Sequence, residues 1–211
     1  MLRNSDASVT LADGSAETRR WTIGGANLNA FVGLNGPYRQ DADHDGVLDS
    51  TPTNASAAGF ELTGLDLGLV LNLEKTASGG RSAPRGWLSL KATAEQATEV
   101  GLPFMTLQAS AMSVYINAGS DGETVIDFKG DQALQVATGD ASQQISLDFD
   151  SARGVQVRAA ADFKLNIADF ITASGSLGFE RSVRDVVLAD GTQAKAEMLA
   201  FGGEGLNAFV G

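Results

Sequence analysis

The stretch Val155-Gln156-Val157-Arg158-Ala159-Ala160-Ala161-Asp162-Phe163-Lys164-Leu165-Asn166-Ile167 alternates between two kinds of side chain. Every odd-numbered position is apolar, and the even-numbered positions are polar or charged apart from Ala160. This period of two predicts a β-strand with one buried face and one wet face. A strand of this length would span roughly 43 Å at about 3.3 Å per residue. We therefore expect the small residues 159–161 to form a corner.

The same alternation recurs in other segments of the chain, at 65–73, 88–94, 105–111 and 145–149. Successive apolar segments begin roughly 14 to 22 residues apart, whereas helical periodicity is weak, so the sequence predicts an all-β protein. A spacing near twenty residues favours an elongated β-solenoid, a β-helix-like stack of coils of about 20 residues. A large antiparallel β-sandwich is the alternative.

The alternation changes phase at two points. Phe60 and Leu62 are even-numbered, whereas the leucines from Leu65 to Leu73 are odd-numbered, and Gly64 lies at the change. A second change falls between Ala111 and Met112. A phase slip beside a small residue predicts a β-bulge or a corner, where an extra residue bends the strand.

One sequence occurs twice. Residues 24–33 and 202–211 are identical at eight of ten positions, and both end in Leu-Asn-Ala-Phe-Val-Gly. Residues 5–14 match 182–191 at six of ten positions, with an offset of 177 residues instead of 178. We therefore predict a tandem array. Residues 1–33 would be the end of one repeat and 34–211 one full period of about 178 residues, with 181–211 equivalent to 3–33. The last strand would then begin the next unit, without its loop.

Composition excludes several classes of function. The net charge of −11 repels phosphates, so we expect no nucleic acid partner. The absence of cysteine removes disulfides, thiolate metal sites and cysteine nucleophiles. No run of 18 apolar residues occurs, so we expect no membrane insertion.

The main chemical motif is Asp41-Ala42-Asp43-His44-Asp45-Gly46-Val47-Leu48-Asp49. Alternate carboxylates in a tight loop can converge on a hard dication, so we predict a Ca²⁺ site. Its ligands would be the carboxylates of Asp41, Asp43, Asp45 and Asp49 and the carbonyl of Val47. His44 would point outward. Water or Glu61 would supply a further ligand.

This loop resembles the calcium loops of EF-hands, dockerins and thrombospondin type 3 repeats. It departs from the EF-hand at loop position 12, where Pro52 stands in place of a bidentate glutamate, and helix signals are absent from its flanks. Elsewhere, Asp148 and Asp150 could form a carboxylate pair for glycoside chemistry, but an exposed charged face is the favoured interpretation. No nucleophile motif accompanies His44, the only histidine. We expect no enzyme.

Taken together, the features resemble a repeat of a giant bacterial secreted or cell-surface adhesin of the calcium-dependent, type I-secreted kind. The resemblance implies an extracellular structural extender, rigidified by Ca²⁺, whose partners are neighbouring repeats of the same chain. Cut ends would expose strand edges that can self-associate. The alternative is a carbohydrate-active or carbohydrate-binding β-helix module.

Overall fold

The computed structural model describes residues 1–45, 48–49, 51, 54–76 and 83–211. It is an all-β structure, as predicted, and the described residues contain no α-helix, only two short 3₁₀ turns, η1 (Gly130–Gln132) and η2 (Ser151–Arg153). The strands are β1 (Leu2–Leu11), β2 (Gly14–Leu34), β3 (Ala58–Glu74), β4 (Gly86–Val100), β5 (Met105–Gly119), β6 (Leu134–Ala137), β7 (Gln144–Leu147), β8 (Gln156–Ile167), β9 (Ile171–Val187) and β10 (Gln193–Val210).

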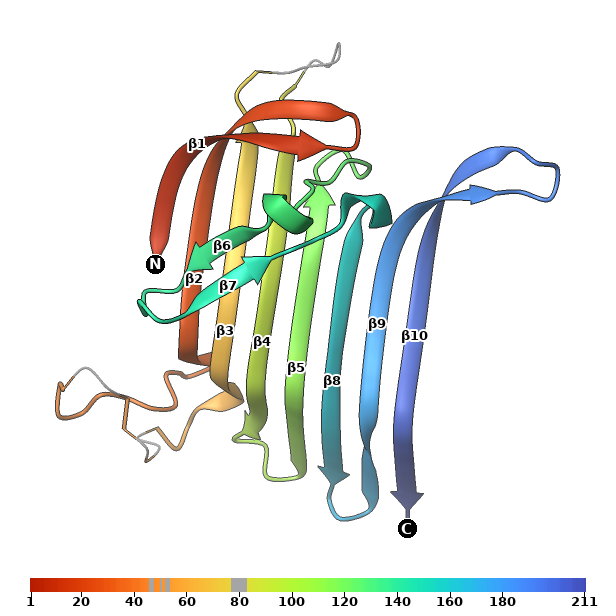
Figure 1. Ribbon diagram of the computed structural model, residues 1–211. Coiled ribbons are helices and arrows are strands. Elements are labelled where there is room, and N and C mark those ends of the chain that lie inside the picture. The colour runs from red at the N-terminus through yellow and green to blue at the C-terminus, as the bar shows by residue number, and fades with distance from the viewer. Residues whose placement is uncertain (46–47, 50, 52–53, 77–82) are drawn as a thin grey trace.

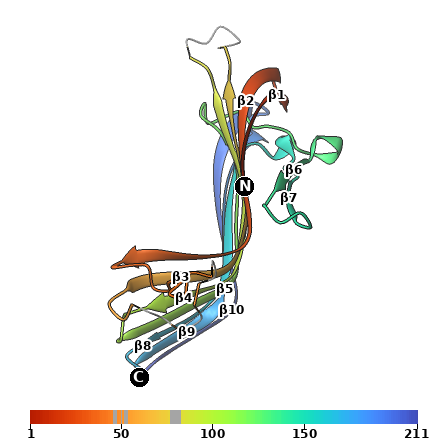
Figure 2. The ribbon, with the colours of Figure 1, turned by 90° about the vertical axis from the view of Figure 1, so that its left-hand side faces the viewer.

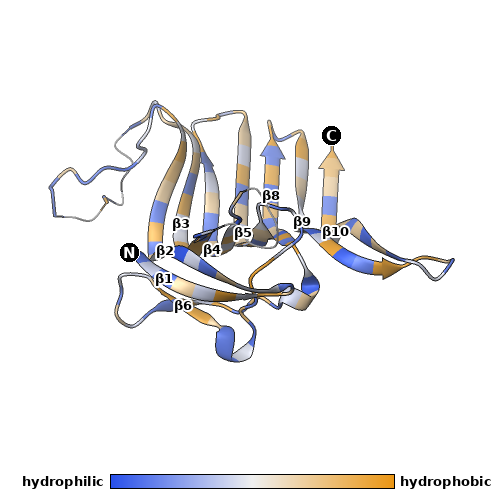
Figure 3. Cartoon of the chain, turned by 90° about the horizontal axis from the view of Figure 1, so that it is seen from above, coloured by the Kyte–Doolittle hydropathy of each residue, from blue (hydrophilic) through white to orange (hydrophobic). Residues whose placement is uncertain are grey.

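Eight long strands form one open antiparallel sheet in the order β1-β2-β3-β4-β5-β8-β9-β10 (Figure 1). Each strand pairs with the strand that precedes it in the sheet order, so the chain runs as a meander. The predicted β-solenoid is not seen in the described part of the chain. A long strand plus its turn repeats near twenty residues, as a solenoid coil does, and the sequence spacing could not separate the two. Hydrophobic and hydrophilic residues alternate along these strands (Figure 3).

The sheet is sharply bent across its strands (Figure 2). Along the bend lie residues with positive φ, namely Asn27 at 51°, Gly64 at 60°, Ala111 at 49° and Gly205 at 60°. The pairing register shifts at Asn27 in β2, at Ala111 in β5 and at Gly205 in β10. Both predicted phase changes therefore fall at the bend. The corner expected at residues 159–161 lies opposite the bulge of β5. Within β8, however, the pairing with β9 has no register shift at these residues.

A small second layer covers one part of the sheet. The hairpin β6–β7 crosses the face of the upper half of the sheet (Figures 1 and 2). Trp87, Phe128 and Leu147 are fully buried between the layers. The rest of this core is formed by Val9, Leu11, Ala16, Val70, Ile126, Val136 and Phe149. The structure is thus sandwich-like there, while the lower half of the sheet is a single layer.

The duplicated sequence forms two hairpins at opposite edges of the sheet. In β1–β2, Val9 pairs with Ala16 and Leu2 pairs with Ile23. At the equivalent positions of β9–β10, Val186 pairs with Ala194 and Phe179 pairs with Phe201. The register is therefore the same in both hairpins. The additional residue that separates the offsets of 177 and 178 falls in the second turn, where Leu188 N donates to Thr192 O at 2.8 Å.

The bulge is also repeated. Asn27 and Gly205 are equivalent, and both have a positive φ, of 51° and 60°. In each copy a leucine folds back over a glycine. A Cβ on Gly25 would lie 2.5 Å from Leu28 Cδ1, and a Cβ on Gly203 would lie 2.9 Å from Leu206 Cδ1. A side chain at Gly25 or Gly203 would require the leucine to move, so each of these glycines leaves room for the leucine that folds over it.

Candidate metal-binding loop

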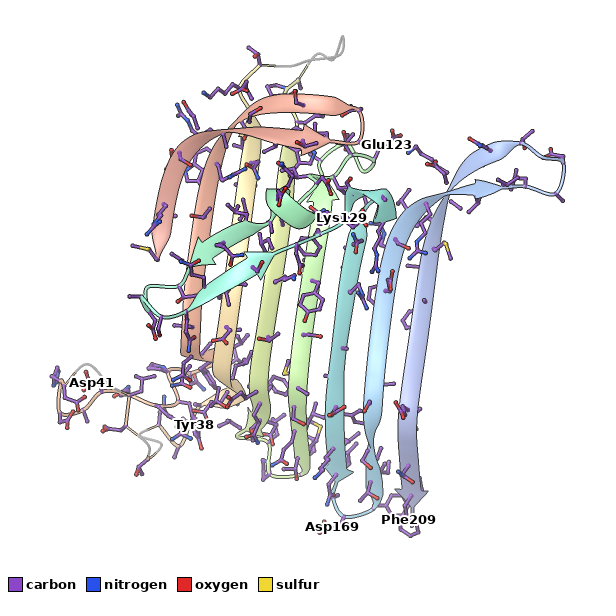
Figure 4. The ribbon with its side chains drawn as sticks, viewed as in Figure 1. Tyr38, Asp41, Glu123, Lys129, Asp169 and Phe209 are labelled. Atoms are coloured by element: carbon purple, nitrogen blue, oxygen red, sulfur yellow. The ribbon has the colours of Figure 1, made fainter. Side chains whose placement is uncertain are left out.

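The aspartate-rich loop connects β2 to β3 and projects from the lower end of the sheet (Figure 4). Three of the predicted ligands converge, because one carboxylate oxygen each from Asp41, Asp43 and Asp45 lies within 4.8 Å of the others. Asp43 and Asp45 are exposed and Asp41 is half-buried. The sequence spacing thus brings together the carboxylates that it predicted at loop positions 1, 3 and 5.

Backbone hydrogen bonds fix the turn. Asp45 N lies 3.0 Å from Asp41 Oδ1 and 3.3 Å from Asp43 Oδ1. Asp49 is tied to the start of the loop, since its Oδ2 accepts from Ala42 N at 3.1 Å and its own N donates to Gln40 O at 3.0 Å. Asp49 therefore turns toward the loop, although its carboxylate is outside the converging group of three.

Two other predictions concern residues within the motif. His44 is exposed, as predicted, and adopts a positive φ of 60°. Val47, predicted to offer its carbonyl, lies outside the described residues together with Gly46. The prediction for Val47 is therefore unchanged by the structure.

Glu61, considered above as a further ligand, is instead held by Arg39. Arg39 Nη2 lies 3.1 Å from Glu61 Oε2, and Arg39 Nε also donates to Glu61 Oε1. The hydrogen bond to Glu61 raises the pKa of Arg39, although partial burial opposes it. Sequence reasoning missed this ion pair because Arg39 and Glu61 are 22 residues apart and meet only when β3 returns beside β2.

The loop is anchored to the sheet by aromatic packing. Tyr38 stacks on Phe31 of β2, with ring centroids 6.3 Å apart, and Arg39 lies over the Tyr38 ring at 5.7 Å. A Cβ on Gly36 would lie 2.6 Å from Phe31 Cδ1, so the chain passes close to this ring. The residues that make these contacts line a cleft of about 680 Å³, together with Asp41 and Glu61. The duplicated phenylalanine is therefore the point at which the loop rests on the sheet.

The donor set suits a hard dication. All the converging atoms are carboxylate oxygens, which Ca²⁺ and Mg²⁺ prefer and which soft metals do not. Backbone carbonyls and water commonly complete calcium loops. Of these two ions, Ca²⁺ accepts six to eight oxygens in varied geometry, whereas Mg²⁺ requires near-ideal octahedral geometry.

The second carboxylate pair has a different environment. Asp148 is ion-paired with Lys91, and Asp150 Oδ2 lies 2.7 Å from Lys129 Nζ. Asp150 also caps the turn η2 by accepting from Ala152 N at 2.9 Å. The hydrogen bond from Lys129 lowers the pKa of Asp150, whereas a catalytic acid at neutral pH needs a raised one. These contacts give Asp148 and Asp150 structural partners.

No protein-family model, curated protein or solved structure matches this chain. Within the described residues, none of the helical segments has the length and apolar character needed to span a bilayer.

Proposed function

We propose that this chain is a structural repeat of a tandem array in a large bacterial extracellular or cell-surface protein. The observation that supports the proposal most strongly is the pair of twin hairpins. Two copies of one sequence pair in one register and lie at opposite edges of one sheet. An array built on this pattern grows sideways, perpendicular to its strands.

The dimensions of such an array follow from the strand order. One period runs from β2 to its equivalent β10 and adds β3, β4, β5, β8, β9 and β10 to the sheet. At about 4.8 Å per strand, each period lengthens the array by about 29 Å. The product is a bent ribbon that carries one β6–β7 layer per period.

Calcium would act on the link between β2 and β3. In the absence of a cation, the clustered carboxylates of Asp41, Asp43 and Asp45 repel one another. A bound dication would neutralise them and hold the loop against Tyr38 and Phe31. Extracellular modules bind Ca²⁺ at about 10⁻⁴–10⁻³ M, so the loop would order outside the cell and not in the cytosol.

Small-angle X-ray scattering on chains of one, two and three periods, in millimolar calcium, tests this function. A structural extender should keep a constant cross-section while its length grows by about 29 Å per added period. Chains that instead form compact particles, with no direction of growth, would contradict the extender function.

A further inference from the structure

We propose that the hairpin β9–β10 is the first hairpin of the next unit, so that neighbouring units share one uninterrupted sheet. The proposal rests on the tandem function above and adds how units join. The occupant of the β10 edge is a second copy of residues 34–149, whose β3 would pair with β10 as β3 pairs with β2. Its β6–β7 layer would cover the hairpin.

Glycines that have no steric role in one copy have one in the other. A Cβ on Gly24 would lie 2.2 Å from Ala137 O of β6, so the covering layer requires glycine there. Its equivalent, Gly202, has nothing within 4 Å. Similarly, a Cβ on Gly33 would lie 2.2 Å from Ala58 O, whereas a Cβ on Gly211 would meet only Phe209 at 3.3 Å or more. The second hairpin therefore has glycines at the positions where the first hairpin contacts β6 and Ala58 of β3, although it makes no such contacts itself.

Some apolar residues are likewise covered in the first hairpin and exposed at the equivalent position of the second. Leu11 is 5% exposed in the core, where it bridges to Ile126, but its equivalent Leu188 is 47% exposed. Phe31 stacks on Tyr38, but its equivalent Phe209 is 62% exposed at the end of β10 (Figure 4). Phe201 of β10 is 78% exposed and its equivalent Ile23 is 42% exposed, whereas Val210 and its equivalent Val32 are similarly exposed, at 64% and 66%. The difference is therefore concentrated at Leu188, Phe201 and Phe209, and apolar side chains exposed in this way mark an interaction site.

The equivalent aspartates in the two hairpin turns, Asp13 and Asp190, have different partners. Asp13 is held by Arg85, with Oδ2 and Nη1 2.9 Å apart, and Arg85 comes from the segment between β3 and β4. Its equivalent Asp190 accepts hydrogen bonds from the N and Oγ1 of Thr192 in its own turn. In the joined array, the second copy of Arg85 would reach Asp190.

The register of the junction follows residue by residue from β2–β3. Gly24 pairs with Gly68 and Val32 pairs with Phe60. Gly202 would therefore lie opposite the second copy of Gly68, and Val210 opposite the second copy of Phe60. The bulge at Gly205 would match that at Asn27, which keeps the bend continuous through the junction.

Cysteine labelling tests this junction, since the chain has no cysteine of its own. The two-period chain is residues 1–211 followed directly by a second copy of residues 34–211. Leu188→Cys should react with a thiol reagent at least about tenfold more slowly in this chain than in the 211-residue chain, because a covering layer shields it. Val187→Cys is the matched control. Its equivalent Thr10 is exposed in the first hairpin, so its rate should not change.

A second measurement needs no substitution. Residues 35–211, which lack their own first hairpin, are mixed with the unmodified 211-residue chain, and the mixture is analysed by analytical ultracentrifugation and circular dichroism. The β9–β10 hairpin of the full chain should complete a truncated chain, whose own β9–β10 hairpin can complete the next one, so mixed complexes larger than either chain should form. Equal labelling of Leu188→Cys in both chains would overturn the proposal, as would a mixture without a complex. The scattering and labelling results can also differ. If the array lengthens with each period while Leu188→Cys reacts equally fast in both chains, the extender function stands and only the shared sheet is rejected.

Discussion

Arg85 Nη1 lies 2.9 Å from Asp13 Oδ2, and this contact ties the turn of the first hairpin to the interior of the sheet. The same guanidinium approaches Glu74, with Nη2 and Oε1 3.2 Å apart, and lies 4.9 Å from the centre of the Trp87 ring. Burial alone would lower the pKa of Arg85, but its hydrogen bonds with Glu74 and Asp13 raise it overall. Arg85 thus links the turn of the first hairpin to Glu74 at the end of β3 and to Trp87 in β4.

Replacing Arg85 should destabilise the protein strongly. Arg85→Met leaves the carboxylate of Glu74 buried without this cation, and breaking a buried pair costs about 3–5 kcal/mol. Urea unfolding measures the loss. Arg3→Met, at an exposed position of the edge strand β1, is the control and should change stability by less than about 0.5 kcal/mol. Equal stability of the two variants would show that the Arg85 contacts contribute little.

Calcium should raise the melting temperature through the loop carboxylates. An ion that binds only the folded state stabilises it by an amount that grows with the ion's concentration and reaches about 1.4 kcal/mol at ten times the dissociation constant. Thermal melts in calcium and in chelator check this. Asp43→Asn should abolish the shift, whereas Asp131→Asn, an exposed aspartate in η1, should preserve it. A calcium shift unaffected by Asp43→Asn would place the site elsewhere.

Asp121 should make stability fall in acid. Burial raises the pKa of Asp121, but hydrogen bonds from Thr124 and Glu123 more than offset this and lower it below 3.8. A lowered folded-state pKa gives stability that is fully present above the unfolded value and is lost as the pH falls through the folded one. Thr124 also accepts from the buried Trp87 Nε1 at 3.0 Å.

The unfolding free energy of wild type and Asp121→Asn, measured from pH 7 to pH 2, tests this. The difference between them should be largest near neutral pH and shrink below about pH 3.8, where the wild-type carboxylate takes up its proton. A difference that stays constant across this range would mean that the charge of Asp121 is not involved.

Glycine at position 111, in the bend, should give a more stable protein than the native Ala111. Its φ of 49° is unfavourable for a residue with a Cβ, so Ala111→Gly should stabilise the protein by about 0.5–1 kcal/mol. Ala109→Gly, in the same strand with ordinary backbone geometry, should destabilise by a similar amount. Chemical denaturation compares the two. The same sign of change for both variants would count against strain at the bend.

The local sequence pattern was sufficient to predict the strands and the positions of the bulges. Alternation through 155–167 predicted β8, and the phase changes at Gly64 and Ala111 marked the bend, because side-chain period and backbone register are linked directly. The duplicated sequence likewise predicted two equivalent elements. Each of these signals lies within a short stretch of chain.

Long-range pairing was not predictable in the same way. The spacing near twenty residues fits a meander as well as a solenoid, and only the strand order separates them. The pairs Arg39–Glu61 and Arg85–Asp13 join residues 22 and 72 positions apart. Their formation depends on which strands become neighbours. Charges of this kind carry no local periodic signal.

Amide hydrogen exchange along β10 in the two-period chain tests the shared sheet most directly. In the 211-residue chain β10 is an edge strand, whereas its twin β2 lies between β1 and β3. We predict that residues 193–210 exchange at edge-strand rates in the 211-residue chain and slow to the rates of β2 when a second period follows. If β10 exchanges equally fast in both chains while β2 remains protected, units do not share a sheet.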